Sequence, residues 1–169
     1  NNGKIDLRTP NGALTINGGS DDSSSVGVSA DGSGAVALKA TGSTGTRTLT
    51  VNADVLSGSG LFDLYAEEAL TVGAGVSLTT GTGGVVRVES GAAGLGLGAG
   101  SSVTTSGGGL LFVAGKTAVT VDDNSTLTGG TGGLLVRAGT DLSVGSGSAL
   151  SAESTGLVLL EAETGNLTL

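Results

Sequence analysis

The sequence contains no cysteine, no histidine and no methionine. Without cysteine, the chain can form neither disulfides nor thiolate metal sites. The side chains that most often act as general bases, nucleophile partners and zinc ligands are therefore absent, and we expect neither a nucleophilic triad nor a zinc site. Because the first residue is not methionine, we expect the chain to be a processed or excised segment, and it contains no signal peptide.

Basic residues are scarce as well. Seven lysines and arginines stand against fifteen acids, which gives a net charge of −8. This charge opposes binding to the phosphates of nucleic acids, whose affinity depends largely on Lys and Arg, and it disfavours anionic membrane surfaces. No apolar run approaches the roughly 20 residues of a membrane-spanning helix. We therefore expect no nucleic-acid partner and no membrane insertion.

What the chain does have is glycine and short aliphatic runs. It contains 34 glycines and one proline, and 37% of its residues are hydrophobic. Flexible linkers and disordered segments are poor in Val, Leu and Ile, so this apolar content argues for a folded core. Only Phe62, Phe112 and Tyr65 are aromatic, so the core must be aliphatic. We expect one domain over residues 1–169.

An internal repeat is the main signal. Two apolar residues flank a small or polar one in a triplet that recurs along the chain, and from the third triplet onward the intervals are 25, 24, 23 and 25 residues. The triplets are Leu14-Thr15-Ile16, Leu49-Thr50-Val51, Leu70-Thr71-Val72, Leu95-Gly96-Leu97, Val119-Thr120-Val121, Leu142-Ser143-Val144 and Leu167-Thr168-Leu169.

Two further apolar columns keep the same period. One follows each triplet, at Leu78, Val103, Leu127 and Leu150, and the other is an alternating run before it, as in Phe62/Leu64/Ala66 and Leu134/Val136/Ala138. Alternation with period two indicates strands, and helices would need longer runs with less Gly, Thr and Ser. Three short strands in about 24 residues fit one turn of a three-sided solenoid.

The fold prediction is therefore all-β: a right-handed parallel β-helix of about seven coils. Residues 1–59 should form less regular coils, with insertions at turns such as Ser20–Ser25 and Gly42–Arg47, and residues 60–169 should form regular coils of 23–25 residues. A leucine-rich repeat lacks support because its Asn or Cys and its helical arc are missing. A β-sandwich would not repeat three columns at one interval.

The residues between the apolar columns should point outward. A threonine column in the triplets suggests an ice-binding surface, but the next outward column is not threonine, and β-branched strand geometry explains it better. On the preceding strand the outward column includes Asp63 and Arg87, a predicted ion pair, followed by Phe112, Leu135 and Leu159. We predict that these three apolar side chains form an interface. The alternative is a register shifted by one, which would place them in the core.

Other chemistry rests on carboxylates. Glu67/Glu68 and Asp122/Asp123 could be paired catalytic acids, since β-helices can host glycoside hydrolysis, but no aromatic platform accompanies them. Asp122-Asp123-Asn124-Ser125 and Ser20-Asp21-Asp22 offer oxygen ligands for calcium, and solvated acidic turns explain them better. No glycine-rich stretch ends in the GK[ST] of a phosphate-binding loop. We therefore expect no cofactor, no metal and no enzymatic activity.

One repeated phrase carries a family resemblance. It appears as Ala69-Leu70-Thr71-Val72-Gly73-Ala74-Gly75-Val76-Ser77-Leu78 and again as Asp141-Leu142-Ser143-Val144-Gly145-Ser146-Gly147-Ser148-Ala149-Leu150. This phrase resembles the repeats of filamentous-haemagglutinin-type bacterial exoproteins, over nearly the whole chain. Thr9-Pro10-Asn11-Gly12 is similar to the Asn-Pro-Asn-Gly motif of two-partner secretion domains, with Thr9 in place of the first Asn, so no secretion role is assigned to it.

The resemblance implies a large secreted or surface-attached shaft that extends an adhesive tip or joins biofilm contacts. We therefore predict a structural or adhesive stalk segment located outside the bacterial cell. Its partners would be other coils or copies of the same protein, and host or cell-surface glycans or proteins. Two alternatives stay open: a self-assembling extracellular filament subunit that stacks through its end coils, and a β-helical enzyme acting on polysaccharides.

Overall fold

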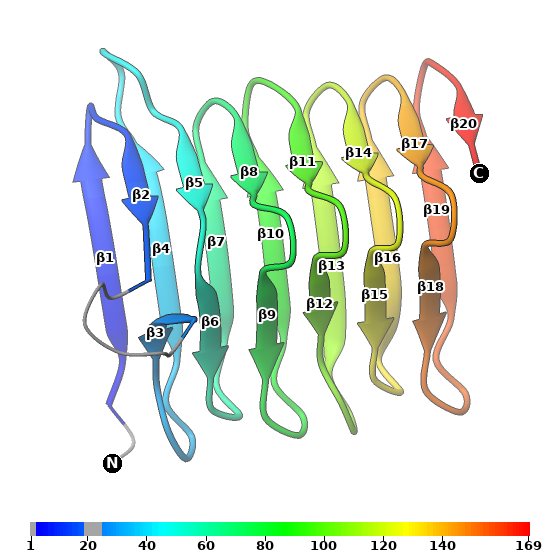
Figure 1. Cartoon of the computed structure of the whole chain (residues 1–169), viewed down its shortest axis with the longest axis horizontal. Helices are drawn as coiled ribbons and strands as arrows, with labels where there is room; N and C mark the ends of the chain where they lie inside the picture. Colours follow the sequence, from blue (N-terminus) through cyan, green and yellow to red (C-terminus); the bar gives the residue numbers. More distant parts are fainter. Residues whose placement is uncertain (1–2, 19–24) are drawn as a thin grey trace.

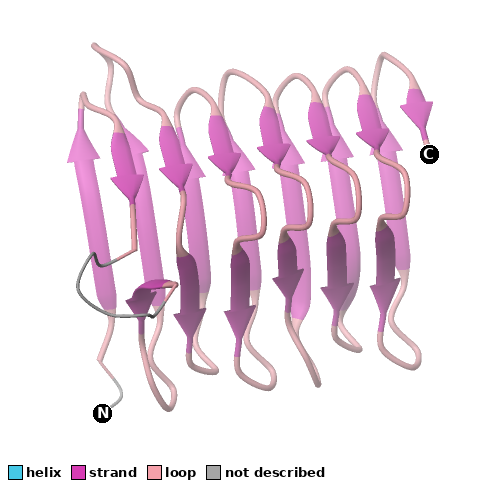
Figure 2. Cartoon of the chain, viewed as in Figure 1, coloured by secondary structure: helices cyan, strands magenta, loops and turns pink. Residues whose placement is uncertain are grey.

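The computed structural model describes residues 3–18 and 25–169. These residues form strands and turns without any helix, as Figure 2 shows. They accordingly contain no helix that could cross a membrane. The all-β prediction is confirmed.

The strands belong to three parallel sheets, and neighbours in each sheet are three strands apart in sequence. The first sheet, here called the long-strand sheet, contains β1 (Ile5–Pro10), β4 (Val36–Thr41), β7 (Phe62–Ala66), β10 (Val86–Ser90), β13 (Leu110–Gly115), β16 (Gly133–Ala138) and β19 (Val158–Ala162). The second, or triplet sheet, contains β2 (Leu14–Ile16), β5 (Leu49–Val51), β8 (Leu70–Val72), β11 (Leu95–Leu97), β14 (Val119–Val121), β17 (Leu142–Val144) and β20 (Leu167–Thr168). The third contains β3 (Val26–Ser29), β6 (Asp54–Ser57), β9 (Ser77–Thr80), β12 (Ser102–Thr104), β15 (Thr126–Gly129) and β18 (Ala149–Ala152).

The described strands therefore make six three-strand coils and begin a seventh with β19 and β20. In Figure 1 it runs up the distant long-strand sheet and down the two nearer sheets while it advances from left to right, which is a right-handed turn. The predicted three-sided, right-handed parallel β-helix is confirmed.

The predicted apolar columns lie in vertical register. The first residues of the seven triplets occupy consecutive rungs of the triplet sheet: Leu14, Leu49, Leu70, Leu95, Val119, Leu142 and Leu167. In the long-strand sheet Leu64, Val88, Val113, Val136 and Leu160 follow one another in the same way. From Leu49 to Leu142 the residues of the triplet column are at most 2% exposed. Because each rung covers the apolar side of its neighbour, the stack itself makes the core.

The irregular intervals near the N-terminus have two structural causes. The connection from β4 to β5 spans residues 42–48, whereas the next connection of this kind spans only 67–69, so the insertion predicted at Gly42–Arg47 is confirmed. Residues 20–24 of the other predicted insertion lie outside the described residues. The interval from Leu49 to Leu70 is four residues shorter than the next one, and two of these four are lost at a different corner: residues 52–53 join β5 to β6, where later coils use four residues, as in 73–76.

These four-residue corners share a left-handed backbone position. Gly75, Gly100 and Gly147 occupy it with φ of 70°, 69° and 72°, and Asn124 occupies it with φ of 58°. Glycine and asparagine tolerate this conformation, which most L-residues avoid. The backbone N–H of Asn124 donates to the Ser146 carbonyl of the next coil at 2.9 Å, so the corners are also joined along the stack.

Candidate functional site

The outer face of the long-strand sheet carries charged side chains together with Tyr65 and Phe112, the two aromatic residues outside the core. On each of its strands the residues that alternate with the core positions point away from the stack. Two outward columns result. The first runs Asp6, Ala37, Asp63, Arg87, Phe112, Leu135, Leu159, and the second runs Arg8, Lys39, Tyr65, Glu89, Ala114, Arg137, Glu161.

The N-terminal half of this face is a network of ion pairs. Lys39 pairs with Asp63, and Nη1 of Arg87 lies 3.9 Å from Oδ1 of the same carboxylate. The Asp63–Arg87 pair predicted from the sequence is thus present, although Lys39 is the closer partner. Asp63 is only 5% exposed, so the long side chains beside it shield its charge from water. Arg87 Nε also donates to Glu89 at 2.7 Å.

Three groups on this half have shifted pKa values. Arg8 and Lys4 donate hydrogen bonds to the carboxylate of Asp6, which holds the pKa of Asp6 well below its usual range. The same contact raises the pKa of Arg8. Burial and a hydrogen bond to Glu67, with 3.1 Å between the oxygens, raise the pKa of the Tyr65 hydroxyl.

The C-terminal half of the first column is apolar. Phe112 pairs with Leu135 in the sheet register, and Leu135 pairs with Leu159, so the three lie on consecutive strands. Their neighbours Leu111 and Leu134 are buried in the core, whereas Phe112 and Leu135 are half-buried and Leu159 is 47% exposed. The outward placement is confirmed and the shifted register is wrong. That the three side chains form an interface stays a prediction.

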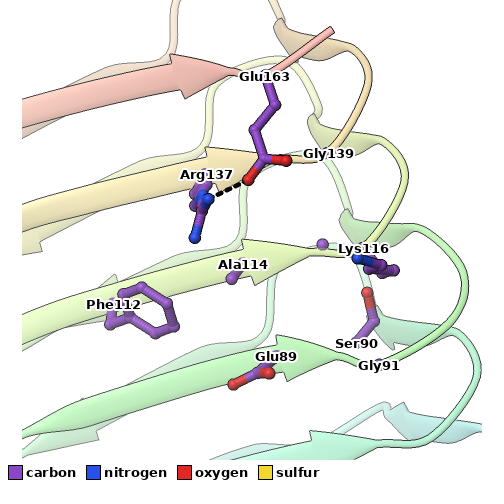
Figure 3. Close-up of a pocket in the computed structure, with 10 residues that line it drawn as sticks. Glu89, Ser90, Gly91, Phe112, Ala114, Lys116, Arg137, Gly139 and Glu163 are labelled. Carbon is purple, nitrogen blue, oxygen red and sulfur yellow. Dashed lines mark ion pairs between the residues drawn. The ribbon is translucent and has the colours of Figure 1, made fainter.

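A recess lies where the charged and apolar halves meet. Its floor is Ala114 of β13, a small side chain in a column otherwise made of long ones. The recess has a volume of about 310 Å³ and is lined by Phe112, Glu89, Arg137, Lys116 and Glu163, together with Ser90, Gly91, Gly115 and Gly139. Figure 3 shows these side chains arranged around Ala114, with the Phe112 ring seen nearly face-on. We call it the Ala114 recess.

Two glycines keep one side of the Ala114 recess open. Lys116 follows β13. Gly91 occupies the corresponding corner of the preceding coil, and Gly139 occupies that of the next coil. Gly139 has no room for a side chain, because a Cβ there would collide with the Lys116 carbonyl oxygen. The side chain of Lys116 is consequently exposed and has no side chain beside it at these two positions.

On another side of the recess, ion pairs hold the side chain of Arg137 in place. Its Nε lies 3.4 Å from Oε2 of Glu161, as predicted from the sequence, and its guanidinium also contacts Glu163. Figure 3 shows Glu163 reaching from the last coil toward Arg137. Two carboxylates thus fix the orientation of this guanidinium, which leaves its other N–H groups available as donors.

Three of the four carboxylates considered as catalytic groups contact other residues. Glu67 accepts the hydroxyl hydrogen bond of Tyr65, and Glu68 pairs with Arg47 at 3.0 Å. Asp123 accepts a hydrogen bond from the backbone N–H of Ser146 at 2.8 Å. These contacts give the acidic residues structural partners in turns.

The acidic turns were also considered as calcium-binding sites. Within residues 3–18 and 25–169, no group of three or more acidic side chains is arranged to hold a metal ion. The Asp122-Asp123-Asn124 turn instead supplies the left-handed corner residue and a bond to the next coil. Ser20-Asp21-Asp22, the other calcium candidate, lies outside the described residues.

Comparison of the chain with protein-family models, with curated proteins and with solved structures finds no significant match. The Ala114 recess was not predicted from the sequence. The signal that could have found it is the single alanine in an outward column of long side chains, followed two residues later by the lysine.

Proposed function

We propose that the chain is a segment of the structural, adhesive stalk of a large secreted or surface-attached bacterial exoprotein. The observation that carries this proposal is the continuous register of the long-strand and triplet sheets, and of the third sheet from β6 onward. In the described residues, seven strands in two of the sheets and six in the third stack on one another, and the buried inward positions are mostly aliphatic, with Phe62 as the aromatic exception. Each coil adds about 4.8 Å along one axis. Such a stack provides length and stiffness, which are the properties a stalk needs.

The first and last strands of the long-strand sheet each have one unpaired edge. β1 pairs only with β4, and β19 only with β16, so each end of the described stack presents a free strand edge. Leu157 and Leu169 near the last rung are 70% and 78% exposed. Another rung of the same pattern would cover these groups, whether it came from the same chain or from a second copy.

Surface labelling tests the location that the proposal requires. The chain contains no cysteine, so Ser43→Cys in the 42–48 connection places one thiol at an exposed position, and Ala66→Cys places one in the core as the matched control. On intact cells of the source organism a membrane-impermeant maleimide should label Ser43→Cys and leave Ala66→Cys unlabelled. Labelling of Ser43→Cys only after lysis would contradict a surface stalk.

A deletion tests whether the stack acts as a spacer. Removing residues 95–118 deletes one full turn, because Leu95 and Val119 occupy the same column. The shortened chain should fold and lose one rung of length, about 4.8 Å, in small-angle scattering of tandem copies. Removing residues 95–106 is the control, since it breaks the register and should unfold the coils around it.

Self-association is a second candidate function, favoured by the apolar column of Phe112, Leu135 and Leu159. Three large apolar side chains on neighbouring strands form a contiguous patch of the kind that marks interfaces. In sedimentation experiments the chain should associate with increasing concentration, and Leu135→Ser with Leu159→Ser should abolish this without unfolding the chain. A wild-type chain that stays monomeric at high concentration would remove this candidate.

A further inference from the structure

We propose that the Ala114 recess binds a short oligosaccharide that carries a carboxylate, such as a uronic-acid oligomer. This goes beyond the stalk proposal, because it assigns a ligand to one place on the outer face. It requires only that the chain folds as described, so it can fail while the stalk proposal stands.

The shape of the recess suits an elongated ligand. Phe112 and Lys116 lie at its two ends and are four residues apart along an extended strand, a span of about 13 Å. The recess volume of about 310 Å³ is at the small end of the range for ligand sites. A shallow trough of this length accommodates a chain of a few sugar rings better than one compact molecule.

One end of the trough offers a flat apolar platform. Phe62 is fully buried in the core, but the ring of Phe112 stands on the outer face and presents its flat side outward (Figure 3). Leu135 extends this apolar surface on the next strand. The C–H face of a pyranose ring can pack on such a ring and remove apolar area from water.

The middle of the trough offers both hydrogen-bond donors and acceptors. Arg137 carries donor N–H groups, while Glu89 and Glu163 carry acceptor oxygens, and all three line the recess. Sugar hydroxyls donate and accept at once, so a polyol can satisfy such a mixed lining. The ion pairs with Arg87 and within the Arg137 cluster hold these groups in place before a ligand arrives, which lowers the ordering cost of binding.

The far end of the trough carries an uncompensated positive charge. Six of the seven basic residues form ion pairs, and Lys116 is the exception: no carboxylate of the described residues pairs with it. In a chain with fifteen acids, an unpaired lysine that borders a recess is the natural site for a ligand carboxylate. This charge distinguishes a uronate from a neutral sugar.

Calorimetric titration with two matched probes tests the proposal. The first probe is the trimer of galacturonic acid, and the second is its fully methyl-esterified form, which keeps the rings and hydroxyls but has no charge. The acidic trimer should bind saturably, and the ester should bind about tenfold more weakly, because it lacks the charge-assisted contact to Lys116. Lys116→Gln should weaken the acid by the same factor and leave the ester unchanged. Lys4→Gln, the control for charge, should change neither.

Filling the recess provides an independent test. Ala114→Leu places a larger side chain on the floor and should abolish binding of the acidic trimer. Ala149→Leu makes the same change at an exposed strand position outside the recess and should leave binding intact. Phe112→Ala should weaken binding, and Leu135→Ala should weaken it less. Circular dichroism melting of each variant shows whether it is folded.

Three results would overturn the proposal. The first is that the wild-type chain binds neither trimer. The second is that acid and ester bind equally well. The third is that the acidic trimer binds folded Ala114→Leu as tightly as the wild type, which would place the ligand elsewhere. If the chain instead self-associates and Phe112→Ala abolishes that without any trimer binding, the apolar column serves a protein partner and the saccharide assignment is wrong.

Discussion

Replacing Leu95 with alanine should destabilise the chain about three times more than the same change at Leu167. Both residues belong to one column of the triplet sheet, on β11 and β20. Leu95 is 2% exposed, between neighbours above and below, whereas Leu167 is 46% exposed on the last rung. The two substitutions remove the same atoms, so any difference comes from position in the stack.

The magnitude follows from burial. Leucine to alanine removes three carbon groups, each contributing about 0.8 kcal/mol when buried, which gives about 2.4 kcal/mol at Leu95. The unfilled cavity raises this to about 3 kcal/mol or slightly more. At Leu167 about half of the side chain is already in water and no closed cavity remains, so we expect a loss of about 1 kcal/mol.

Urea titration followed by far-ultraviolet circular dichroism measures the difference. Because each coil contacts only its neighbours, the Leu167 variant should lose mainly the last rung, while the Leu95 variant should shift the midpoint of the whole transition. Equal losses at the two sites would refute the reasoning, since they would mean that the exposed rung is as well packed as the interior. Leu95→Met, which conserves volume, is the control and should cost little.

Three further changes test other features. Lys39→Met should cost about 2 to 3 kcal/mol in chemical denaturation because it leaves the buried Asp63 carboxylate without its closest partner, and adding Asp63→Leu should restore most of that stability. The lowered pKa of Asp6 contributes stability that is present above its unfolded pKa near 3.9 and is lost as the pH falls further, so the stability difference between wild type and Asp6→Asn should vanish in strong acid. Gly139→Ala should be strongly destabilising in thermal melts because its Cβ meets backbone, whereas Gly96→Ala, with nothing nearby, should be neutral or slightly stabilising.

The stacking of this fold could be predicted because apolar residues recur at a regular interval in the sequence. Leu70, Leu95, Val119 and Leu142 recur at one interval, and a parallel β-helix is the arrangement that places them in one column. The outward position of the apolar residue Phe112 could be predicted from the alternation of apolar residues within the strands. Both predictions needed only the period-two pattern within strands and the repeat between them.

Other features depended on corner lengths or on side-chain contacts between coils, and the repeat pattern encodes neither. The third apolar column was predicted only from Leu78 onward, because the corner at residues 52–53 is two residues shorter than later ones and displaces Val55 in the sequence. The burial of Asp63 depends on how Lys39 and its neighbours fold over it. The Ala114 recess needs side chains from four coils, and only their relative placement reveals a space.

The hydrogen bonds that join the rungs run along the axis of the stack, and this has a mechanical consequence for a protein under tension. A pull along the axis loads one rung at a time, so the coils should peel off singly rather than shear apart together. Since Leu95 and Val119 are one turn apart, each peeled coil should release about 24 residues and lengthen the chain by about 75 Å. A force trace would then show repeated steps of nearly equal length, and a surface fibre built this way would absorb a sudden load by yielding coil by coil before its attachment breaks.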